Sequence, residues 1–234
     1  MDLIFRDDAY AATCTAVVTA VDERGLRLDR TVFYPAGGGQ PGDTGMLRHA
    51  GGAVRIVDTI KGDGPDEIIH VPESEAALPA PGAEVEAEID WNRRYAHMRM
   101  HTCLHLLCAV VPGAVTGGQV GADKSRLDFN VPSGSLDKEE LTQALNRLID
   151  ADRPVQPRWI GDDELAARPE LVRTMSVKPP TGSGTVRLLD IEGIDLQPCG
   201  GTHVRRTGEI GPVEVIKIEN KGKQNRRVVV ALKA

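Results

Sequence analysis

Aromatic residues are scarce: two Trp, three Tyr and three Phe make up 3% of the 234 residues. With so few rings, base stacking is not expected to be a major mode of nucleic-acid binding. The four cysteines lie at irregular spacing, which argues against a disulfide framework and leaves metal binding, catalysis or core packing. No apolar run approaches the ~20 residues of a membrane helix, and three acidic residues among the first eight are unlike a signal peptide. We therefore expect a cytoplasmic protein that has no membrane partner.

The hydrophobic fraction of 41% is sufficient for the core of one large domain or of two small ones. The net charge of -6 hides an asymmetry along the chain. Residues 1–88 carry 7 basic and 16 acidic side chains, whereas residues 199–234 carry 8 basic and 3 acidic ones. The basic C-terminal segment can therefore bind nucleic acid locally, although the whole chain is acidic.

Short runs rich in β-branched residues dominate the chain up to Glu88. They cover residues 13–21, 25–34, 53–60, 67–71 and 84–89, and Gly and Pro clusters separate them. This spacing is typical of a small all-β sheet or barrel. The segment from Pro79 to Gly82 is the best candidate for a linker. We predict a β-rich domain over residues 1–88 and a second domain over residues 89–234.

The hydrophobic period changes in the second part. From Tyr95 to Val111 the apolar positions follow i, i+3, i+4 and i+7, which predicts a buried helix. A second helix follows Asp137, which can cap it together with Glu140 three residues later. After Pro154 we expect short strands, a minor helix near residues 163–167, and a terminal hairpin of segments 213–219 and 227–232 around a loop at 220–226. These patterns therefore predict an α+β protein.

Two histidines of the first predicted helix form a candidate metal-binding pair. His101 and His105 lie four residues apart, so their imidazoles stand on one face about 6 Å apart along the axis and can share one ion. His97 precedes His101 by four residues, so these two form a sterically equivalent pair. All three cannot reach one ion, because they span about 12 Å. The alternative is that they are ordinary helix histidines.

Cys199 and His203 form a second candidate pair, on a segment that Gly200 and Gly201 make pliable. A thiolate and an imidazole can turn onto one ion, and Zn²⁺ accepts mixed sulfur and nitrogen ligands in tetrahedral geometry. The competing interpretation makes Cys199 a buried thiol and His203 a solvated loop residue. Together, the two pairs supply four ligands of the right type, and we predict one Zn²⁺ per chain. Its ligands would be His101, His105, Cys199 and His203.

Five segments carry a resemblance to a known family. HTCLHLL at 101–107 and CGGTHV at 199–204 resemble the two zinc motifs of the editing domain of alanyl-tRNA synthetase and of the free-standing AlaX trans-editing proteins. GGGQPGDTG at 37–45, SRLDFN at 125–130 and TGEIGP at 207–212 agree with this resemblance, which covers essentially the whole chain. Threonyl-tRNA synthetase has a related domain. The Gly-rich segment is similar to that of medium-length AlaX proteins, in which a β-domain precedes the editing domain.

The resemblance implies hydrolysis of tRNA for alanine that carries a wrong amino acid, with a seryl ester as the main target and a glycyl ester as a second one. We expect no aminoacylation and no need for ATP, because the chain has no room for an aminoacylation domain. The ester is intrinsically labile, so activation of water and good positioning suffice. Zinc can polarise the carbonyl, lower the pKa of a bound water or hold the substrate.

The predicted ligand set raises a question about the role of zinc. Four protein ligands make a closed site, whereas a catalytic zinc keeps a position open for water or substrate. Either the metal expands to five ligands, or one of the four, with His203 as our choice, is loosely held.

By the same resemblance, Gln119 matches a glutamine of the synthetase editing pocket. Its amide can accept a hydrogen bond from a seryl hydroxyl and orient water, while the alternative is a glutamine in a surface turn. The Gly-rich segment lacks the GK[ST] ending of a phosphate loop, and we place it over the editing pocket, with a simple β-turn as the alternative. The predicted substrate pocket comprises Gly38, Gly39, Gln40, Thr102 and Asp128.

Basic residues near the C-terminus are the predicted tRNA contacts. Four of them fall within the seven residues 221–227, at the predicted hairpin loop, where they can contact phosphates of the acceptor end. Such runs are also commonly just solvated. The predicted contacts are Arg205, Lys221, Lys223, Arg226 and Arg227, which Arg93, Arg94 and Arg206 extend.

Two other functions fit the same residues. One is a zinc-dependent deacylase of another mischarged aminoacyl-tRNA. The other is a non-catalytic tRNA-binding module with a structural zinc, which predicts binding that weakens steeply with salt but no ester cleavage.

Overall fold

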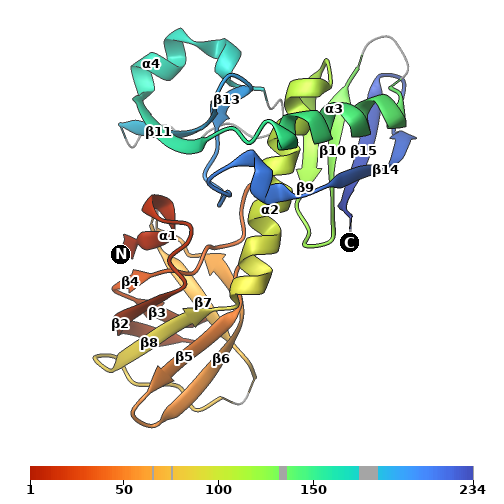
Figure 1. The fold of residues 1–234 in the computed structure, drawn as a ribbon. Helices are drawn as coiled ribbons and strands as arrows, with labels where there is room; N and C mark the ends of the chain where they lie inside the picture. Colours follow the sequence, from red (N-terminus) through yellow and green to blue (C-terminus); the bar gives the residue numbers. More distant parts are fainter. Residues whose placement is uncertain (65, 75, 132–135, 174–183, 234) are drawn as a thin grey trace. The chain divides into compact units, whose positions relative to one another are not determined.

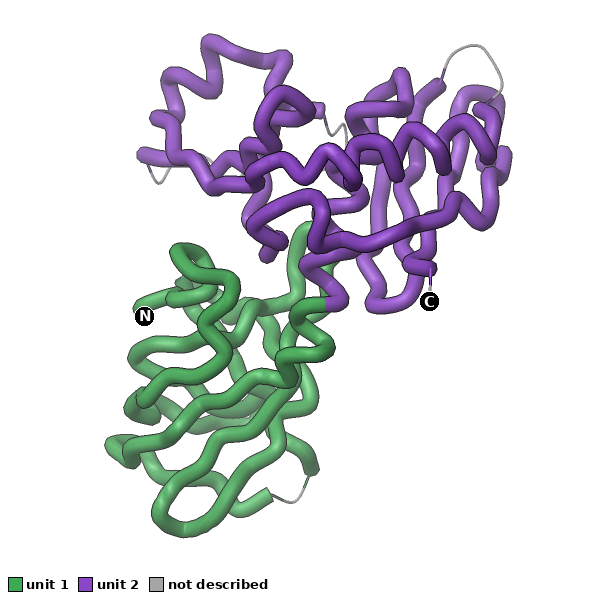
Figure 2. The backbone as a smooth tube through the Cα atoms, viewed as in Figure 1, with its two compact units in different colours: residues 1–95 green, residues 96–234 purple. Residues whose placement is uncertain are grey.

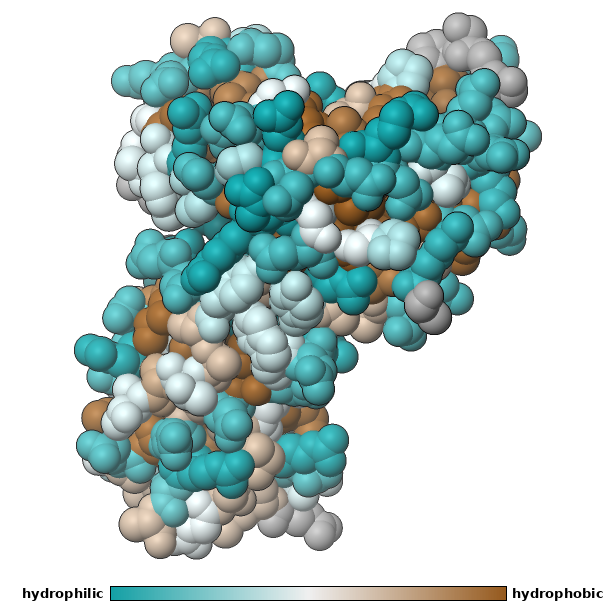
Figure 3. Space-filling model, in the orientation of Figure 1, coloured by the Kyte–Doolittle hydropathy of each residue, from teal (hydrophilic) through white to brown (hydrophobic). Residues whose placement is uncertain are grey.

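The computed structural model describes residues 1–64, 66–74, 76–131, 136–173 and 184–233 (Figure 1). The chain divides into two compact units, Met1–Tyr95 and Ala96–Ala234, which we call unit 1 and unit 2 (Figure 2). The division falls inside helix α2 (Trp91–Val110). In Figure 3, hydrophilic residues cover much of the visible face of unit 2, whereas the visible face of unit 1 mixes hydrophilic and hydrophobic residues. Among the described residues, no helix has the length and apolar character needed to cross a membrane.

Unit 1 is built around a closed barrel with strand order β2-β3-β7-β6-β5-β8, so the predicted β-rich fold is confirmed. All pairings within the barrel are antiparallel. In β8 the exposed residues Glu84, Glu86 and Glu88 alternate with buried Val85, Ala87 and Ile89, as a strand with one buried face requires. The barrel strands are β2 (Thr13–Asp22), β3 (Gly25–Leu28), β5 (Gly45–His49), β6 (Gly52–Lys61), β7 (Ile68–Pro72) and β8 (Glu84–Ile89). Unit 1 also contains β1 (Asp2–Leu3), α1 (Ile4–Asp7) and β4 (Arg30–Thr31), and β1 pairs with β4.

Two details of unit 1 differ from the sequence expectation. The run at 25–34 is not one strand, because Asp29 separates β3 from β4 and its carboxylate accepts a hydrogen bond from the Val17 N–H. The expected linker at Pro79 to Gly82 is wrong. It lies inside unit 1 between β7 and β8, where the Gly82 N–H donates to the Val18 carbonyl at 2.8 Å.

Helix α2 begins at Trp91, four residues before the expected start. The Asp90 carboxylate accepts a hydrogen bond from the Arg93 N–H at 3.1 Å and so caps the first turn. From Met98 to Cys108 most side chains are buried, which explains why this helix shows little amphipathic contrast. Arg94 is fully buried and paired with Asp43, both in unit 1, so our expectation that it extends a tRNA-binding surface is wrong.

A four-stranded antiparallel sheet of unit 2 has the order β14-β15-β10-β9. Helix α3 (Lys138–Asp150) packs on β14 through buried Leu141, Leu145 and Ile149. The Asp137 carboxylate caps α3 as expected, accepting from the backbone N–H groups of Glu139 and Glu140. The strands are β9 (Ala114–Gln119), β10 (Lys124–Asn130), β14 (Val213–Asn220) and β15 (Asn225–Leu232).

The terminal hairpin forms as expected, but its loop is shorter. Asn220 pairs with Arg226, so the ladder reaches into the segment that we expected to be loop. The turn comprises only residues 221–224, and Arg226 and Arg227 lie on β15.

The second sheet of unit 2 has the order β11-β12-β13, with antiparallel pairing. It consists of β11 (Val155–Gly161), β12 (Thr185–Ile191) and β13 (Asp195–Pro198). Helix α4 (Asp162–Ala167) and the short helix η1 (Pro169–Leu171) contribute Leu165 and Leu171, which pack with Val186 and Leu188 of β12. After β13 the chain continues through the CGGTHV segment to the short helix η2 (Thr207–Ile210).

Candidate metal centre

Two segments of unit 2 bring four potential ligands together. Helix α2 presents His101 and His105 one turn apart, and the segment after β13 presents Cys199 and His203. One donor atom from each of the four lies within 4.8 Å of all the others. The three histidines are buried and Cys199 is partly buried. Of the two histidine pairs that the helix offers, the one in this cluster is His101 with His105, without His97.

The distances within the cluster fit a small tetrahedral ion. The Cys199 Sγ lies 3.2 Å from His203 Nε2 and 3.7 Å from His101 Nε2. Zinc with nitrogen ligands at about 2.0 Å and a sulfur ligand at about 2.3 Å holds its tetrahedral ligands about 3.5 Å from one another. The donor set therefore fits Zn²⁺ in both chemistry and spacing.

Hydrogen bonds around the cluster orient its imidazoles. His105 Nδ1 lies 2.9 Å from Asp195 Oδ2, so the ring directs Nε2 toward the cluster. The Gln197 side-chain amide donates to the same carboxylate oxygen at 2.7 Å. The Gly201 N–H lies 3.4 Å from Cys199 Sγ, where it stabilises a thiolate. Outer partners of this kind fix the tautomer and direction of metal-binding histidines.

Thr102, which we expected in the substrate pocket, is fully buried against His203. Its hydroxyl donates to the Met98 carbonyl at 2.9 Å, so the 3.1 Å contact with His203 Nδ1 is one in which the ring N–H donates. The Val204 N–H donates to the same hydroxyl at 3.3 Å. Thr102 thus orients His203, the ligand that we expected to be loosely held, and leaves its Nε2 directed at Cys199.

The electrostatics of the cluster favour a bound cation. Burial alone would raise the pKa of the Cys199 thiol, but His101 and His203 beside it lower that pKa well below its usual range. For His105, burial lowers the pKa, but hydrogen bonds to Asp195 and Cys199 outweigh this effect and raise the pKa to about 10. Burial lowers the pKa of His203, which favours the neutral ring. An anionic sulfur among imidazoles attracts positive charge, and a divalent cation supplies it.

Sequence reasoning missed Asp195 and Gln197, although the alternation of β13 carries the signal. Asp195, Gln197 and Cys199 are two residues apart, so in a strand their side chains leave the same face. That face meets His105, as the hydrogen bonds above establish.

Two other predicted site residues lie on the β9–β10 hairpin. Gln119 is exposed at the end of β9, and its Oε1 accepts a hydrogen bond from Arg126 Nε at 3.4 Å. Asp128 on β10 accepts two hydrogen bonds from Arg227, at 2.7 and 2.8 Å, and a third from Arg126 at 3.2 Å. The hydrogen bonds from Arg227 lower the pKa of Asp128. Asp128 therefore stays anionic and links β10 to the basic β15.

The Gly-rich segment of unit 1 contains a tight β-turn. Gly37 and Gln40 exchange two backbone hydrogen bonds of 3.0 Å, and the central residues Gly38 and Gly39 have φ of 58° and 83°. Residues with side chains rarely adopt two such angles in succession, so the turn favours glycine at both positions. Gln40 is buried within unit 1.

The predicted tRNA contacts differ in how strongly they are held. The Arg205 N–H donates to Glu209 while its side chain is exposed, and Lys221 lies 3.7 Å from Glu219. Lys223 is exposed, and Arg226 donates to the Gly222 carbonyl at 3.2 Å. Arg227 is engaged by Asp128. Of the residues expected to extend this set, Arg206 is paired with Asp152 and Arg93 donates to the Gly42 carbonyl.

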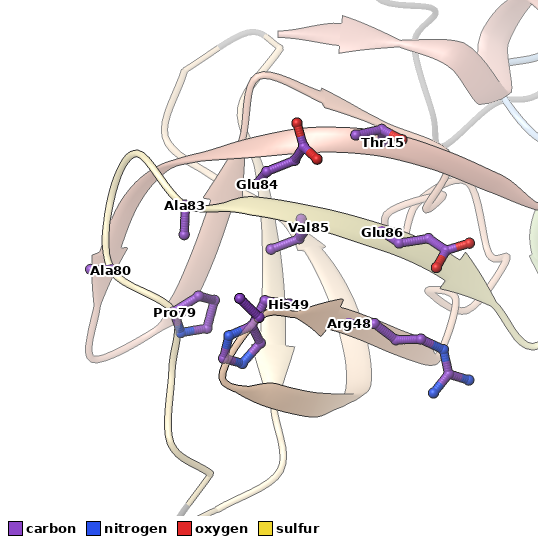
Figure 4. Close-up of a pocket in the computed structure, with 10 residues that line it drawn as sticks. Thr15, Arg48, His49, Pro79, Ala80, Ala83, Glu84, Val85 and Glu86 are labelled. Atoms are coloured by element: carbon purple, nitrogen blue, oxygen red, sulfur yellow. The ribbon is translucent and has the colours of Figure 1, made fainter.

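A separate pocket lies on the barrel of unit 1 (Figure 4). Arg48, His49, Glu84 and Glu86 line it from β5 and β8, with the segment at Pro79 beside them. None of the predicted site residues belongs to it.

Comparisons with known proteins identify the family. Residues 186–229 match the family described as threonyl and alanyl tRNA synthetase second additional domain, and residues 8–93 match tRNA synthetases class II (A). The alanyl-tRNA editing protein AlaX-M of Methanosarcina acetivorans is 39% identical over 99% of this chain and 98% of its own. That of Methanosarcina barkeri is 41% identical over 96% of both chains. The alanine–tRNA ligase of Pyrobaculum calidifontis is 36% identical over 92% of this chain but only 25% of the ligase.

The barrel and the α+β unit with its His/Cys cluster define a protein of the threonyl/alanyl-tRNA synthetase editing type. Within this class, the chain belongs to the AlaX-M family of alanyl-tRNA editing proteins.

Proposed function

We propose that this protein is an aminoacyl-tRNA deacylase, which hydrolyses the ester bond of mischarged tRNA for alanine in trans. Its main substrate is the seryl ester and its second one the glycyl ester. Support comes from relatives that are named alanyl-tRNA editing proteins and that align with this chain over 98% and 96% of their own length. The ligase relative contains the same region as a quarter of its chain, which is consistent with an editing function separated from aminoacylation.

The observation that carries the proposal is the cluster of His101, His105, Cys199 and His203, whose donor atoms converge within 4.8 Å. These residues would hold one Zn²⁺ per chain. When bound, the ion can polarise the ester carbonyl, activate water or hold the substrate. The chain's own contribution is preorganisation, because Asp195 and Thr102 already direct the imidazoles of His105 and His203 inward.

Selectivity for the amino acid would come from polar groups that the seryl hydroxyl satisfies. Gln119 is our candidate for accepting that hydroxyl and orienting the attacking water. A group that is hydrogen-bonded by serine stays unpaired when alanine enters, which disfavours the correct product. We assign hydrolysis to a domain of residues 89–234 and the shaping of selectivity to the β-domain of residues 1–88. The residues proposed to contact the substrate are Gly38, Gly39 and Gln40 of the β-domain, and Thr102 and Asp128 of the hydrolytic domain.

Binding of the tRNA would use the basic C-terminal region. Exposed lysine and arginine side chains there can contact phosphates, and each contact releases counterions from the nucleic acid. The tRNA affinity should therefore fall steeply with salt. The proposed contacts are Arg205, Lys221, Lys223, Arg226 and Arg227.

The test is the rate at which the zinc-loaded protein releases labelled serine from Ser-tRNA for alanine. Gly-tRNA and correctly charged Ala-tRNA are measured in parallel. We expect fast release of serine, slower release of glycine and no release of alanine. Cys199→Ser should abolish release and lower zinc content, whereas Cys14→Ser, which changes a cysteine of the barrel unit, should leave both unchanged.

Two outcomes would redirect the assignment. Release from another mischarged tRNA, with Ser-tRNA for alanine left intact, would make the protein a deacylase of a different substrate. Salt-sensitive tRNA binding by a zinc-loaded protein that cleaves no ester would make it a binding module with a structural zinc.

A further inference from the structure

Trp159 is the one tryptophan of the chain with an exposed ring. It lies on β11, the edge strand of the three-stranded sheet, and is 50% exposed. The other tryptophan, Trp91, packs its ring against Tyr10 and Tyr95 at centroid distances of 5.5 Å. A large exposed ring on an edge strand is unusual in a surface that is otherwise mainly polar, and it indicates a binding position.

The strand register places Trp159 in one row with a predicted metal ligand. Trp159 pairs directly with Arg187 on β12. Arg187 in turn faces Cys199, since Leu188 pairs with Pro198 and the Cys199 N–H donates to the Arg187 carbonyl at 3.1 Å. Paired residues of neighbouring strands share a face of the sheet. Because strands lie about 4.8 Å apart, the backbones of Trp159 and Cys199 are about 10 Å apart across the row.

The face that carries this row is the one that meets the metal centre. Asp195 and Gln197 precede Cys199 by an even number of residues, and both contact His105. The opposite face of the sheet packs Val186 and Leu188 against Leu165 of α4. Trp159 therefore belongs to the metal-facing side and has no part in the core on the other side.

Positive charge borders the ring. The Arg187 guanidinium donates to the carbonyls of Cys199 and Gly201 at 2.7 and 3.1 Å, which fixes a cation between the ring and the cluster. An aromatic face beside a guanidinium group suits a nucleobase with its attached phosphate.

We propose that Trp159 stacks an unpaired base at the ester-bearing 3′ end of the nucleic-acid substrate, with Arg187 between that base and the metal centre. The proposal rests on the proposed function for the identity of the substrate. An ester on the terminal ribose places a base one sugar away from the bond to be cleaved, which matches a ring in the same row as Cys199. One stacking position also agrees with a chain that has few aromatic residues.

Fluorescence tests this binding without any ester. Trp91→Phe leaves Trp159 as the only tryptophan, and the variant is titrated with a short single-stranded RNA that ends in CCA. We expect quenching by this RNA and at least tenfold weaker quenching by the same RNA with an abasic 3′-terminal nucleotide. Equal quenching by the two RNAs, or quenching by neither, would overturn the proposal.

Kinetics on Ser-tRNA for alanine provide the second arm. Trp159→Ala should lower kcat/KM about tenfold through KM, and Trp159→Phe should restore most of it, because a phenyl ring still stacks. The matched control is Ile216→Ala, which removes another exposed hydrophobic side chain of unit 2, and it should match the unmodified protein. An unchanged KM in Trp159→Ala would count against the stacking role.

The two arms separate this inference from the proposed function. Base-dependent quenching in a protein that cleaves no ester would retain the stacking position and remove the deacylase assignment. Ester cleavage with an unchanged KM in Trp159→Ala and no base-dependent quenching would retain the deacylase assignment and remove the stacking position. Concentration-dependent self-association that Trp159→Ala abolishes, without quenching by RNA, would assign the ring to a protein interface and overturn the proposal.

Discussion

Asp195 lies directly behind His105, with its Oδ2 2.9 Å from the ring Nδ1. The carboxylate is fully buried and also accepts a hydrogen bond from Gln197. This arrangement requires a proton on Nδ1 and therefore leaves Nε2 of His105 free to bind an ion. The residue that orients one ligand thus lies four positions before another ligand, Cys199, which follows the end of β13.

Asp195→Asn should weaken zinc binding about 10- to 100-fold, because the amide no longer fixes the tautomer of His105 or neutralises the ion's charge. The measurement is the zinc dissociation constant by competition with a chromogenic chelator. Asp190→Asn is the matched control, since Asp190 lies on neighbouring β12 but is paired with Arg158. Equal zinc affinities for the two variants would show that Asp195 does not support the metal centre.

Local patterns made much of this architecture predictable. The alternation in β8 and the apolar stripe of α3 are visible in consecutive residues, and so are the two pairs of ligands, each spaced by four. The sequence shows less clearly that the two pairs meet, because the distance between His105 and Cys199 depends on packing between segments 94 residues apart in the chain. The family resemblance, and not spacing alone, made the four-ligand set specific.

Expectations about arginines failed for a physical reason. From the sequence we expect Arg93 and Arg94 to extend the tRNA contacts, but Arg94 is buried and hydrogen-bonded to Asp43, which lies 51 residues earlier. Nothing in the residues around Arg94 indicates this partner. The position of Trp159 was equally hidden in the sequence, because its place in a row with Cys199 follows only from the register of three strands.

Removing zinc should destabilise unit 2 and leave the barrel unit largely unaffected, because all four ligands lie in unit 2. At a free zinc concentration 1,000 times the dissociation constant, binding contributes about 4 kcal/mol to stability. For a unit of this size, that corresponds to a fall of roughly 15 °C in the unfolding temperature after chelation.

Single-tryptophan variants can locate this effect. Trp159 fluorescence in Trp91→Phe reports on unit 2, and Trp91 fluorescence in Trp159→Phe reports on the end of unit 1. We expect the chelator to shift the Trp159 transition and to leave the Trp91 transition in place. A zinc-independent Trp159 transition would contradict a stabilising metal centre.

Asp43→Asn should strongly destabilise unit 1. Arg94 Nε donates to both carboxylate oxygens of Asp43 at 3.1 and 2.9 Å, and both side chains are buried. Removing one charge of a buried pair leaves the other uncompensated, at a cost of about 3–5 kcal/mol. The measurement is the urea midpoint of the barrel transition.

The control for this pair is Glu73→Gln, which breaks an exposed ion pair with Arg55 at 3.8 Å. Its cost should stay below about 1 kcal/mol, because surface pairs are screened. Arg94→Met combined with Asp43→Leu should recover part of the loss, since it removes both buried charges. A single Asp43→Asn no more destabilising than the control would contradict the importance of this pair.

His70 should make the barrel sensitive to acid. The ring is fully buried, with Nε2 2.8 Å from Thr31 Oγ1 and Nδ1 3.2 Å from the Leu26 carbonyl. Burial lowers the pKa of His70 from 6.5 to about 4. Because the unfolded chain binds this proton more readily, stability is fully present above pH 6.5 and is lost as the pH falls toward 4. Between pH 7.5 and pH 5 the loss is about 2 kcal/mol.

The measurement is the free energy of unfolding of the barrel at several pH values, followed by Trp91 fluorescence in Trp159→Phe. His70→Gln in that background supplies the comparison, because its amide can still hydrogen-bond but does not titrate. We expect the variant to be less stable than its parent at pH 7.5 and to lose less stability on acidification. Parallel pH profiles for the two proteins would mean that the acid sensitivity of the barrel comes from other groups, and that His70 is not the residue that titrates on unfolding.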